Sequence, residues 1–283
     1  MIQRHFFQKT GVYWLLILPS VAFLLVIFLY PISLVLVKSF LDPSLTSAHY
    51  LQFFKNPVYF RVFVITFKIS LTVTLLCLVL GYPIAYLLSR APDRVRNYLM
   101  ILVLIPFWMS LLVRNYAWMV FLGREGVLNR ILLGVGIIDA PLKLLHTTFA
   151  VVVGMVHMML PFMILALFSV MKGIDLGLLK AAASLGAGSV QTFVRVYFPL
   201  SLPGVAAGSL LVFIFSLGFF ITPALLGGRG DMMISMLIEA QVSELLNWGF
   251  GSVLAVILLV MTLILFYFYN RFLGLDRIWG GAS

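Results

Sequence analysis

Two ionisable side chains, Lys68 and His157, lie well inside long apolar stretches of this 283-residue sequence. An ionisable group surrounded by hydrocarbon is costly to bury, so such residues are candidates for a functional site by default. Each residue also has a plainer interpretation. The stem of Lys68 can run along apolar surface until its ammonium group reaches water, and a single histidine is more often a hydrogen-bonded packing residue than a ligand. Both interpretations stay open for each residue.

Other candidates for a functional site are aromatic or charged and lie near the ends of apolar stretches. The rings of Trp108, Tyr116 and Trp118 offer faces that attract a cationic amine, although tryptophan at a membrane surface is also a common anchor. Arg114 ends an apolar stretch, and three roles are open to it: pairing with an acidic loop residue, contacting a partner protein or anchoring at the interface. The residues that we assign to the pathway are Trp108, Arg114, Tyr116, His157, Phe219 and Glu239.

Several kinds of chemistry have no candidate residues. The sequence contains no paired acids, no metal-spaced cluster of histidine and cysteine and no nucleophile elbow, so we predict that the chain is not an enzyme. It contains no G-x-x-x-x-G-K-[ST] loop to cradle ATP phosphates, and we predict no cofactor or metal site on this chain. No Asp or Glu lies in the middle of an apolar stretch, which argues against the alternative of an ion-driven transporter or channel that works alone.

The elements that must position these residues are membrane-spanning helices. Hydrophobic residues make up 63% of the chain and charged residues only 10%, against roughly 25% charged residues in a soluble domain. A helix needs about 20 apolar residues to cross a bilayer, and several stretches qualify. The predicted spans are 12–37, 62–89, 98–122, 147–171, 205–226 and 250–272. We therefore predict an all-α integral membrane protein that forms a single domain over residues 1–283.

The distribution of charge indicates what the chain contacts and how it is oriented. The net charge of +10 comes from cations scattered between the apolar stretches, so we predict contact with membrane lipid and none with nucleic acid. An even number of spans places both termini on one side of the membrane. The loop RAPDRVR, residues 90–96, follows the second span and carries three arginines, which favours a cytoplasmic location for that side.

The segment between the fourth and fifth spans, residues 173–203, is predicted to form two short helices joined by an elbow. Asp175 can cap the first helix by accepting hydrogen bonds from its first backbone N–H groups. Gly186 lies where a left-handed residue usually ends a helix. Ser189 can cap the second helix, and Pro199 is expected to stop it. The alanines in KAAASLG leave a thin surface that suits docking against another protein, although a plain connecting loop remains the alternative.

At these residues the sequence resembles the permease subunits of ATP-driven, binding-protein-dependent importers, the ABC importers. Their cytoplasmic signature is Glu-Ala-Ala, three residues, Gly, nine residues, then Ile-x-Leu-Pro. The same spacing runs here from Lys180 to Pro199, with Lys180 in place of the family's Glu. In the family this segment inserts into the ATPase subunit, and we call residues 173–203 the coupling segment. The resemblance implies an ATPase-coupling role for Lys180, Ala181, Ala182, Leu185, Gly186, Ala187, Val196, Phe198 and Pro199.

Stretches from about Val62 to Phe272 resemble the spermidine/putrescine permeases within that family. Examples are IPFW at 105–108, LVRNYAW at 112–118 and LLGG at 225–228. The resemblance implies the six-span fold of type I ABC importer permeases and a location in the bacterial inner membrane. It also implies alternating access that moves a polyamine, an opine or an amino-acid derivative into the cytoplasm.

The same resemblance implies partners for this chain. Two copies of an ATPase subunit would hold ATP and Mg²⁺ below the membrane. A second, similar permease would form a heterodimer with this one, and a periplasmic binding protein would deliver the solute.

Overall fold

The structure is a computed structural model that describes residues 2–41 and 47–273. Every regular element within these residues is a helix, and the described residues form two compact units. Unit 1 holds the residues up to Asn56 together with Ile238–Val260, and unit 2 holds Pro57–Leu237 together with the residues from Met261 onward. The helices are α1 (Ile2–Lys38), α2 (Ala48–Lys55), α3 (Pro57–Arg90), α4 (Asp93–Leu104), η1 (Ile105–Trp108), α5 (Leu111–Leu122), α6 (Val127–Gly134), α7 (Thr148–Met171), α8 (Leu176–Ser184), α9 (Ser189–Thr192), η2 (Phe193–Tyr197), α10 (Phe198–Leu217), α11 (Ile221–Leu226), α12 (Ile234–Glu239), η3 (Ala240–Glu244) and α13 (Trp248–Leu273).

Within the described residues, 5 helical runs are long and apolar enough to cross a membrane, and one bent pair of helices brings the total up to 6. The runs contain α1, α3, α7, α10 and α13, and the bent pair contains α4 and α5. Each predicted span falls on one of these runs or on the bent pair. This confirms the all-α membrane fold, but the third and fifth predicted spans differ from the structure in detail.

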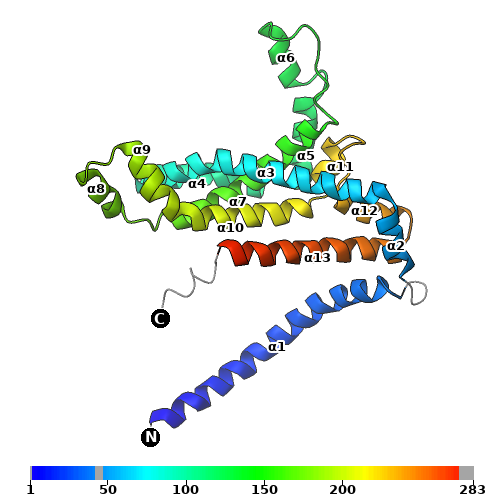
Figure 1. Ribbon diagram of the computed structural model, residues 1–283, viewed down its shortest axis with the longest axis horizontal. Coiled ribbons are helices and arrows are strands. Elements are labelled where there is room, and N and C mark those ends of the chain that lie inside the picture. Colours follow the sequence, from blue (N-terminus) through cyan, green and yellow to red (C-terminus); the bar gives the residue numbers. More distant parts are fainter. Residues whose placement is uncertain (1, 42–46, 274–283) are drawn as a thin grey trace. The chain divides into compact units, whose positions relative to one another are not determined.

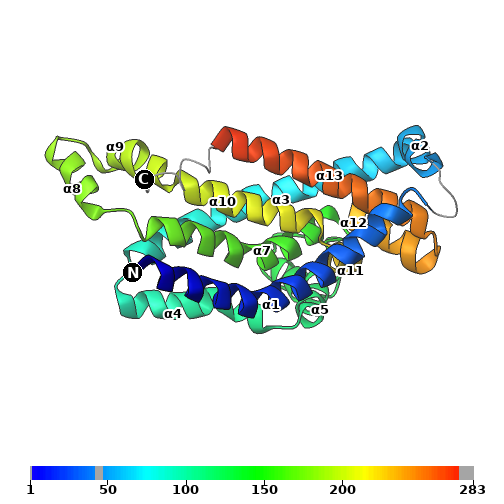
Figure 2. The same ribbon diagram turned by 90° about the horizontal axis from the view of Figure 1, so that it is seen from below.

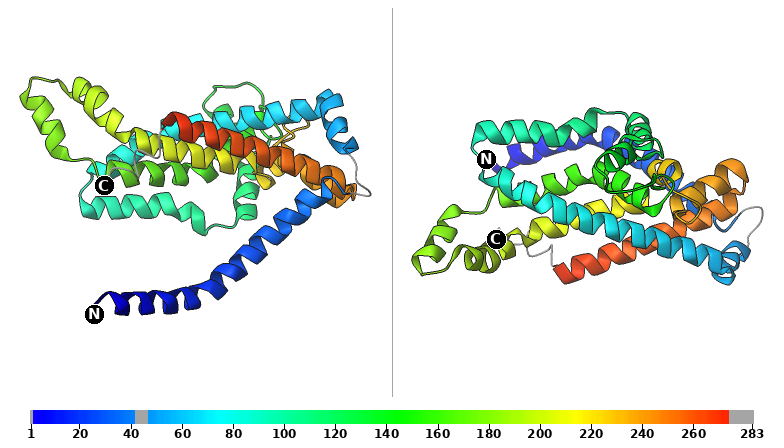
Figure 3. Two further views of the ribbon diagram at one scale, coloured as in Figure 1. Left: turned by 60° about the horizontal axis from the view of Figure 1, so that its bottom comes forward. Right: turned by 90° about the horizontal axis from the view of Figure 1, so that it is seen from above.

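The third predicted span, 98–122, is not one straight helix. The segments Asp93–Trp108 and Leu111–Gly134 meet at 96° (Figure 3, left panel, teal and green). The break follows the 3₁₀ turn η1, where Pro106 has no N–H to continue an α-helical ladder. The two residues of the break, 109–110, are extended, with ψ of 136° and 135°. Apolar composition alone does not reveal this change of direction.

The fifth predicted span, 205–226, begins too late and ends too late. Its helix runs from Ser189 through α9, the π-turn η2 and α10 to Leu217. Gly218 then ends it, and a separate short helix, α11, follows. Pro199, near the start of this run, does not end it.

The core of unit 2 is a layer of three helices, α3, α7 and α10, which lie side by side (Figures 1 and 2). Glycine lets α10 approach α7 closely, because a Cβ atom on Gly208 would lie 2.8 Å from Sδ of Met163. The hydroxyl groups of Tyr82 on α3 and Ser201 on α10 are hydrogen-bonded at 2.8 Å. These contacts hold the helices that position the candidate site.

In unit 1, the C-terminal end of α1 lies near α2 and near the first part of α13. The ammonium group of Lys38 lies 4.5 Å from the ring centre of Trp248. The hydroxyl group of Tyr50 donates a hydrogen bond of 2.9 Å to Ser39, and its ring stacks on Phe40 with ring centres 5.0 Å apart.

Candidate functional site

The first helix of the coupling segment is α8, and both of its predicted ends are confirmed. Asp175 accepts a hydrogen bond of 2.7 Å from the backbone N–H of Gly177. Gly186 has φ of 86°, in the left-handed region. Its N–H donates to the carbonyl of Ala183 at 3.0 Å, and the next N–H along the chain donates to the carbonyl of Ala182 at 3.1 Å. This is the Schellman pattern, and it requires the left-handed backbone that glycine adopts without strain.

The second half of the coupling segment corrects two predictions. Gly188, and not Ser189, is the N-cap of α9. Pro199 does not stop the helix, which continues unbroken from Ser189 to Leu217. The π-turn η2 ends immediately before α10, so Pro199 occupies the first turn of a renewed α-helix. There the missing N–H of proline is tolerated, and the wider turn before it takes up the misfit.

An apolar surface on the coupling segment is left uncovered. Leu185 is 89% exposed and Val190 is 77% exposed, and Leu176 and Leu178 are also exposed. We call these four residues the coupling surface. Lys180 beside them is exposed and forms no ion pair within the described residues. Figure 1 shows α8 and α9 extending beyond the ends of α7 and α10.

Of the other predicted coupling residues, Ala182, Ala187 and Val196 are half-buried, and Ala181, Gly186, Phe198 and Pro199 are exposed.

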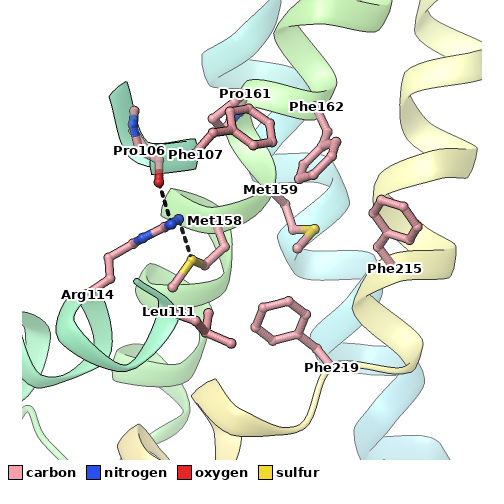
Figure 4. Close-up of a pocket in the computed structure, with 10 residues that line it drawn as sticks. All are labelled: Pro106, Phe107, Leu111, Arg114, Met158, Met159, Pro161, Phe162, Phe215 and Phe219. Atoms are coloured by element: carbon pink, nitrogen blue, oxygen red, sulfur yellow. Dashed lines mark hydrogen bonds between the residues drawn. The ribbon is translucent and has the colours of Figure 1, made fainter. Parts of the chain in front are cut away.

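Arg114 lies in the first turn of α5, and its side chain is hydrogen-bonded to residues that precede α5 at the break in the third span. The residue is only 8% exposed. Its guanidinium group donates to the backbone carbonyls of Pro106 and Met109, the latter at 2.9 Å, and contacts Sδ of Met158 on α7 (Figure 4). Its Nε–H is buried and has no acceptor within the described residues. Arg114 is therefore neither exposed as an interfacial anchor nor paired with a described acidic residue, and it links the two halves of the broken span.

Arg114 also forms part of the wall of a cavity of about 380 Å³, which we call the central cavity. The residues that line it are Pro106, Phe107, Leu111, Arg114, Met158, Met159, Pro161, Phe162, Phe215 and Phe219 (Figure 4). Phe162 makes edge-on contacts with Phe107 and Phe215, at ring-centre distances of 4.8 and 5.3 Å. Such a wall suits a methylene chain, and the ring faces attract an ammonium group.

His157 accepts a hydrogen bond from a neighbouring aromatic residue. The indole N–H of Trp118 on α5 donates to Nδ1 of His157 on α7 at 3.0 Å, and the two rings are tilted at 75°. A neutral imidazole that accepts at Nδ1 carries its proton on Nε2. The hydrogen bond agrees with the packing interpretation of His157, and it accounts for the position of Trp118, which is half-buried rather than exposed at the surface.

The remaining predicted pathway residues divide between the cavity and other places. Phe219 lines the central cavity together with Arg114. Trp108 is 90% exposed and Tyr116 is 56% exposed, and neither lines the cavity. Glu239 belongs to unit 1, whereas the central cavity is built entirely from unit 2.

Two groups of residues were missed by reasoning from the sequence. The first is the set of cavity rings Phe107, Phe162 and Phe215, whose only sequence signal is an aromatic residue within an apolar stretch. The second is Asp231, which is only 5% exposed. Its carboxylate accepts hydrogen bonds from the hydroxyl of Thr148 and, at 2.9 Å, from the N–H of Gly228.

Comparisons with known proteins agree on one family. The sequence model described as "Binding-protein-dependent transport system inner membrane component" matches residues 77–273. The chain is 40% identical over 251 residues to the spermidine/putrescine transport system permease protein PotB of Haemophilus influenzae. This match covers 86% of this chain and 87% of the relative. It is 40% identical over 216 residues to the PotB protein of Escherichia coli, covering 76% of this chain and 78% of the relative.

The fold is also shared with a solved ABC transporter chain. A chain in the crystal structure of a bacterial alginate ABC transporter, in complex with an alginate pentasaccharide-bound periplasmic protein, superposes with a TM-score of 0.74. The superposition covers 93% of this chain and 94% of that chain at 20% sequence identity, so it shows a common fold.

Proposed function

Because this chain belongs to the family of binding-protein-dependent transport system inner membrane components, we propose that it moves a small amine-type solute into the cytoplasm by alternating access. The chain is a permease subunit of an ABC importer, a multi-pass membrane protein with the type I permease fold. We further propose which solute it moves, which partner chains it assembles with and on which side of the membrane its termini lie.

The observation that carries the proposal for the solute is the central cavity. Four phenyl rings and two methionine side chains line a space of about 380 Å³ inside unit 2. Aliphatic amines match such a wall, because their methylene groups pack against apolar side chains and their ammonium groups are attracted by ring faces. The relatives named for spermidine and putrescine transport support a polyamine. The Nε–H of Arg114, which has no acceptor among the described residues, supports a carboxylate-bearing amine, such as an opine or an amino-acid derivative.

The coupling surface supports the proposal for the partners. ATP hydrolysis belongs to a separate ATPase subunit, present in two copies, and its movement reaches this chain through residues 173–203. The exposed Leu185 and Val190 provide apolar area for that contact. A second, non-identical permease completes the pathway, and a periplasmic binding protein supplies the solute. Both termini then lie in the cytoplasm, on the side of the coupling segment.

Uptake by the reconstituted importer tests this function. The importer is placed in proteoliposomes with ATP at the ATPase side and binding protein at the other side, and uptake of radiolabelled putrescine is measured. Competition by spermidine, an opine and an unmodified amino acid then ranks the solutes. ATP-dependent uptake that an amine competes away supports the proposal. Uptake by this chain alone without ATP would instead support an ion-driven transporter or channel, and the absence of competition by every amine would reject the solute class.

A further inference from the structure

A second cavity, of about 260 Å³, lies between the end of α3 and the coupling segment. We call it the coupling-side cavity, and it lies entirely within unit 2. The residues that line it are Tyr86, Arg90, Leu179, Ala183, Ala187, Ser189, Thr192, Phe193 and Tyr197. It is separate from the central cavity, with which it shares no lining residue.

Arg90, the last residue of α3, brings unused hydrogen-bond donors to this cavity. Its guanidinium carbon lies 5.3 Å from the ring centre of Tyr86 and 5.1 Å from that of Tyr197. Tyr197 is 1% exposed, and its hydroxyl is hydrogen-bonded to Ser89 at 3.0 Å, so this ring is fixed. Within the described residues, Arg90 has neither a hydrogen-bond acceptor nor a carboxylate partner. The two rings lie close to the guanidinium group, and its N–H groups remain available to a ligand with paired oxygens.

Hydroxyl groups of the coupling segment add to the donors. Oγ1 of Thr192 is buried and has no hydrogen-bond partner within the described residues. Ser189 contributes a second hydroxyl to the lining, and no lining residue is an aspartate or a glutamate. An unpaired buried hydroxyl is costly, so a bound acceptor would stabilise the site. The cavity thus combines the cation of Arg90 with the hydroxyl groups of Ser189, Thr192 and two tyrosines, and it has no anion of its own.

We propose that the coupling-side cavity binds a phosphate group, held by Arg90 and by the hydroxyl of Thr192. A phosphate offers the several acceptor oxygens that these donors require. The headgroup of an anionic phospholipid is the source that the position favours, because Arg90 ends a 34-residue apolar helix that spans the membrane. A free phosphate compound from the cytoplasm has the same chemistry. In either case the ligand joins α3 to the wall formed by α8 and η2, and so stiffens the coupling segment.

Lipid retention by the complete importer tests the proposal. The importer is purified from nanodiscs that contain phosphatidylglycerol or phosphatidylcholine, and bound lipid is counted by native mass spectrometry. Arg90→Gln is expected to lower retained phosphatidylglycerol roughly tenfold, and Thr192→Val about threefold. Arg90→Lys should give an intermediate loss, because it keeps the charge but not the planar fork. Arg195→Gln is the matched control, since Arg195 is exposed on the adjacent turn and does not line the cavity.

A second arm separates the two sources of phosphate. Inorganic phosphate and glycerol 3-phosphate are titrated against the importer in phosphatidylcholine nanodiscs, and its Tm is followed. A rise in Tm that Arg90→Gln abolishes would identify a soluble phosphate compound, and retention of phosphatidylglycerol alone would identify the lipid. Equal lipid loss in Arg90→Gln and Arg195→Gln, or no response to any phosphate, would overturn the proposal. So would loss of the ATPase subunit from Arg90→Gln with lipid retention unchanged, because a partner carboxylate would then fill the cavity.

Discussion

The indole N–H of Trp118 donates a hydrogen bond of 3.0 Å to Nδ1 of His157 and so joins α5 to α7. His157 directly precedes Met158, which lines the central cavity. The pair therefore fixes the position of α5 relative to α7, which carries much of the cavity wall. Loss of this hydrogen bond should lower the stability of the importer by a measurable amount.

Trp118→Phe is expected to destabilise the importer by about 1 kcal/mol, because the ring nitrogen of His157 loses its donor inside the bundle. His157→Leu alone should cost a similar amount, and the double variant should cost clearly less than the sum. Thermal unfolding of the purified complex measures all three. Additive losses would show that the two residues act independently.

Arg114→Met is expected to lower the rate of ATP-dependent uptake at least tenfold, because the carbonyls of Pro106 and Met109 lose their donor and the break in the third span loses its link to α7. Two lost charge-assisted hydrogen bonds amount to roughly 3 kcal/mol. Arg114→Lys should restore part of the activity. Arg124→Met is the control, since Arg124 is exposed, and an equal loss in that variant would contradict the assigned role.

Gly186→Val is expected to abolish coupled uptake, while the complex still hydrolyses ATP at a basal rate. A β-branched residue at φ of 86° is strained by roughly 1–3 kcal/mol, although a Cβ atom there would meet nothing within 4 Å. Gly188→Ala provides the comparison, because Gly188 has φ of −68° and an equally open surrounding. Normal uptake by Gly186→Val would rule out the elbow as the coupling element.

Phe219→Leu is expected to raise the KM for uptake about tenfold, with a smaller change in kcat, because the cavity loses a ring face that attracts the amine. Trp108→Leu changes a residue that is 90% exposed and outside the cavity, and it should shift the KM far less. Initial uptake rates over a range of solute concentrations distinguish the two. The reverse order of effects would place the solute outside the central cavity.

Asp231→Asn is expected to destabilise the complex by about 1–3 kcal/mol. The carboxylate accepts from Thr148 and from Gly228 on different oxygens, whereas an amide has only one acceptor oxygen. Glu125→Gln serves as the control, because Glu125 is exposed. A lower Tm for Asp231→Asn alone would match the structure, and unchanged Tm values for both variants would not.

Much of this fold was predictable because the deciding signals are local. Apolar length locates the spans, and the cap at Asp175 and the glycine at position 186 depend on residues within one or two turns of a helix. These features need no knowledge of distant partners.

The errors arise where tertiary contacts decide. Hydropathy depends on composition and carries no information about the direction of a helix axis. It therefore cannot predict the bend of 96° after Trp108. Pro199 marks a helix end in a local view, but the π-turn before it absorbs the misfit. An arginine is expected at the membrane interface because of its charge. Arg114 is instead buried, because the break leaves the backbone carbonyls of Pro106 and Met109 free to accept hydrogen bonds from its guanidinium group. The central cavity draws on residues up to 113 positions apart, between Pro106 and Phe219, and no local pattern groups them.

The continuity of the helical run from Ser189 to Leu217 has a mechanical consequence. With 29 residues and a rise of 1.5 Å each, the rod is about 43 Å long. The run has no break where the coupling segment joins α10, so tilting the whole run by about 10° displaces one end relative to the other by about 7 Å. A displacement of the coupling segment is thereby passed along one continuous helical run toward Phe215, which lies near the end of α10 and lines the central cavity.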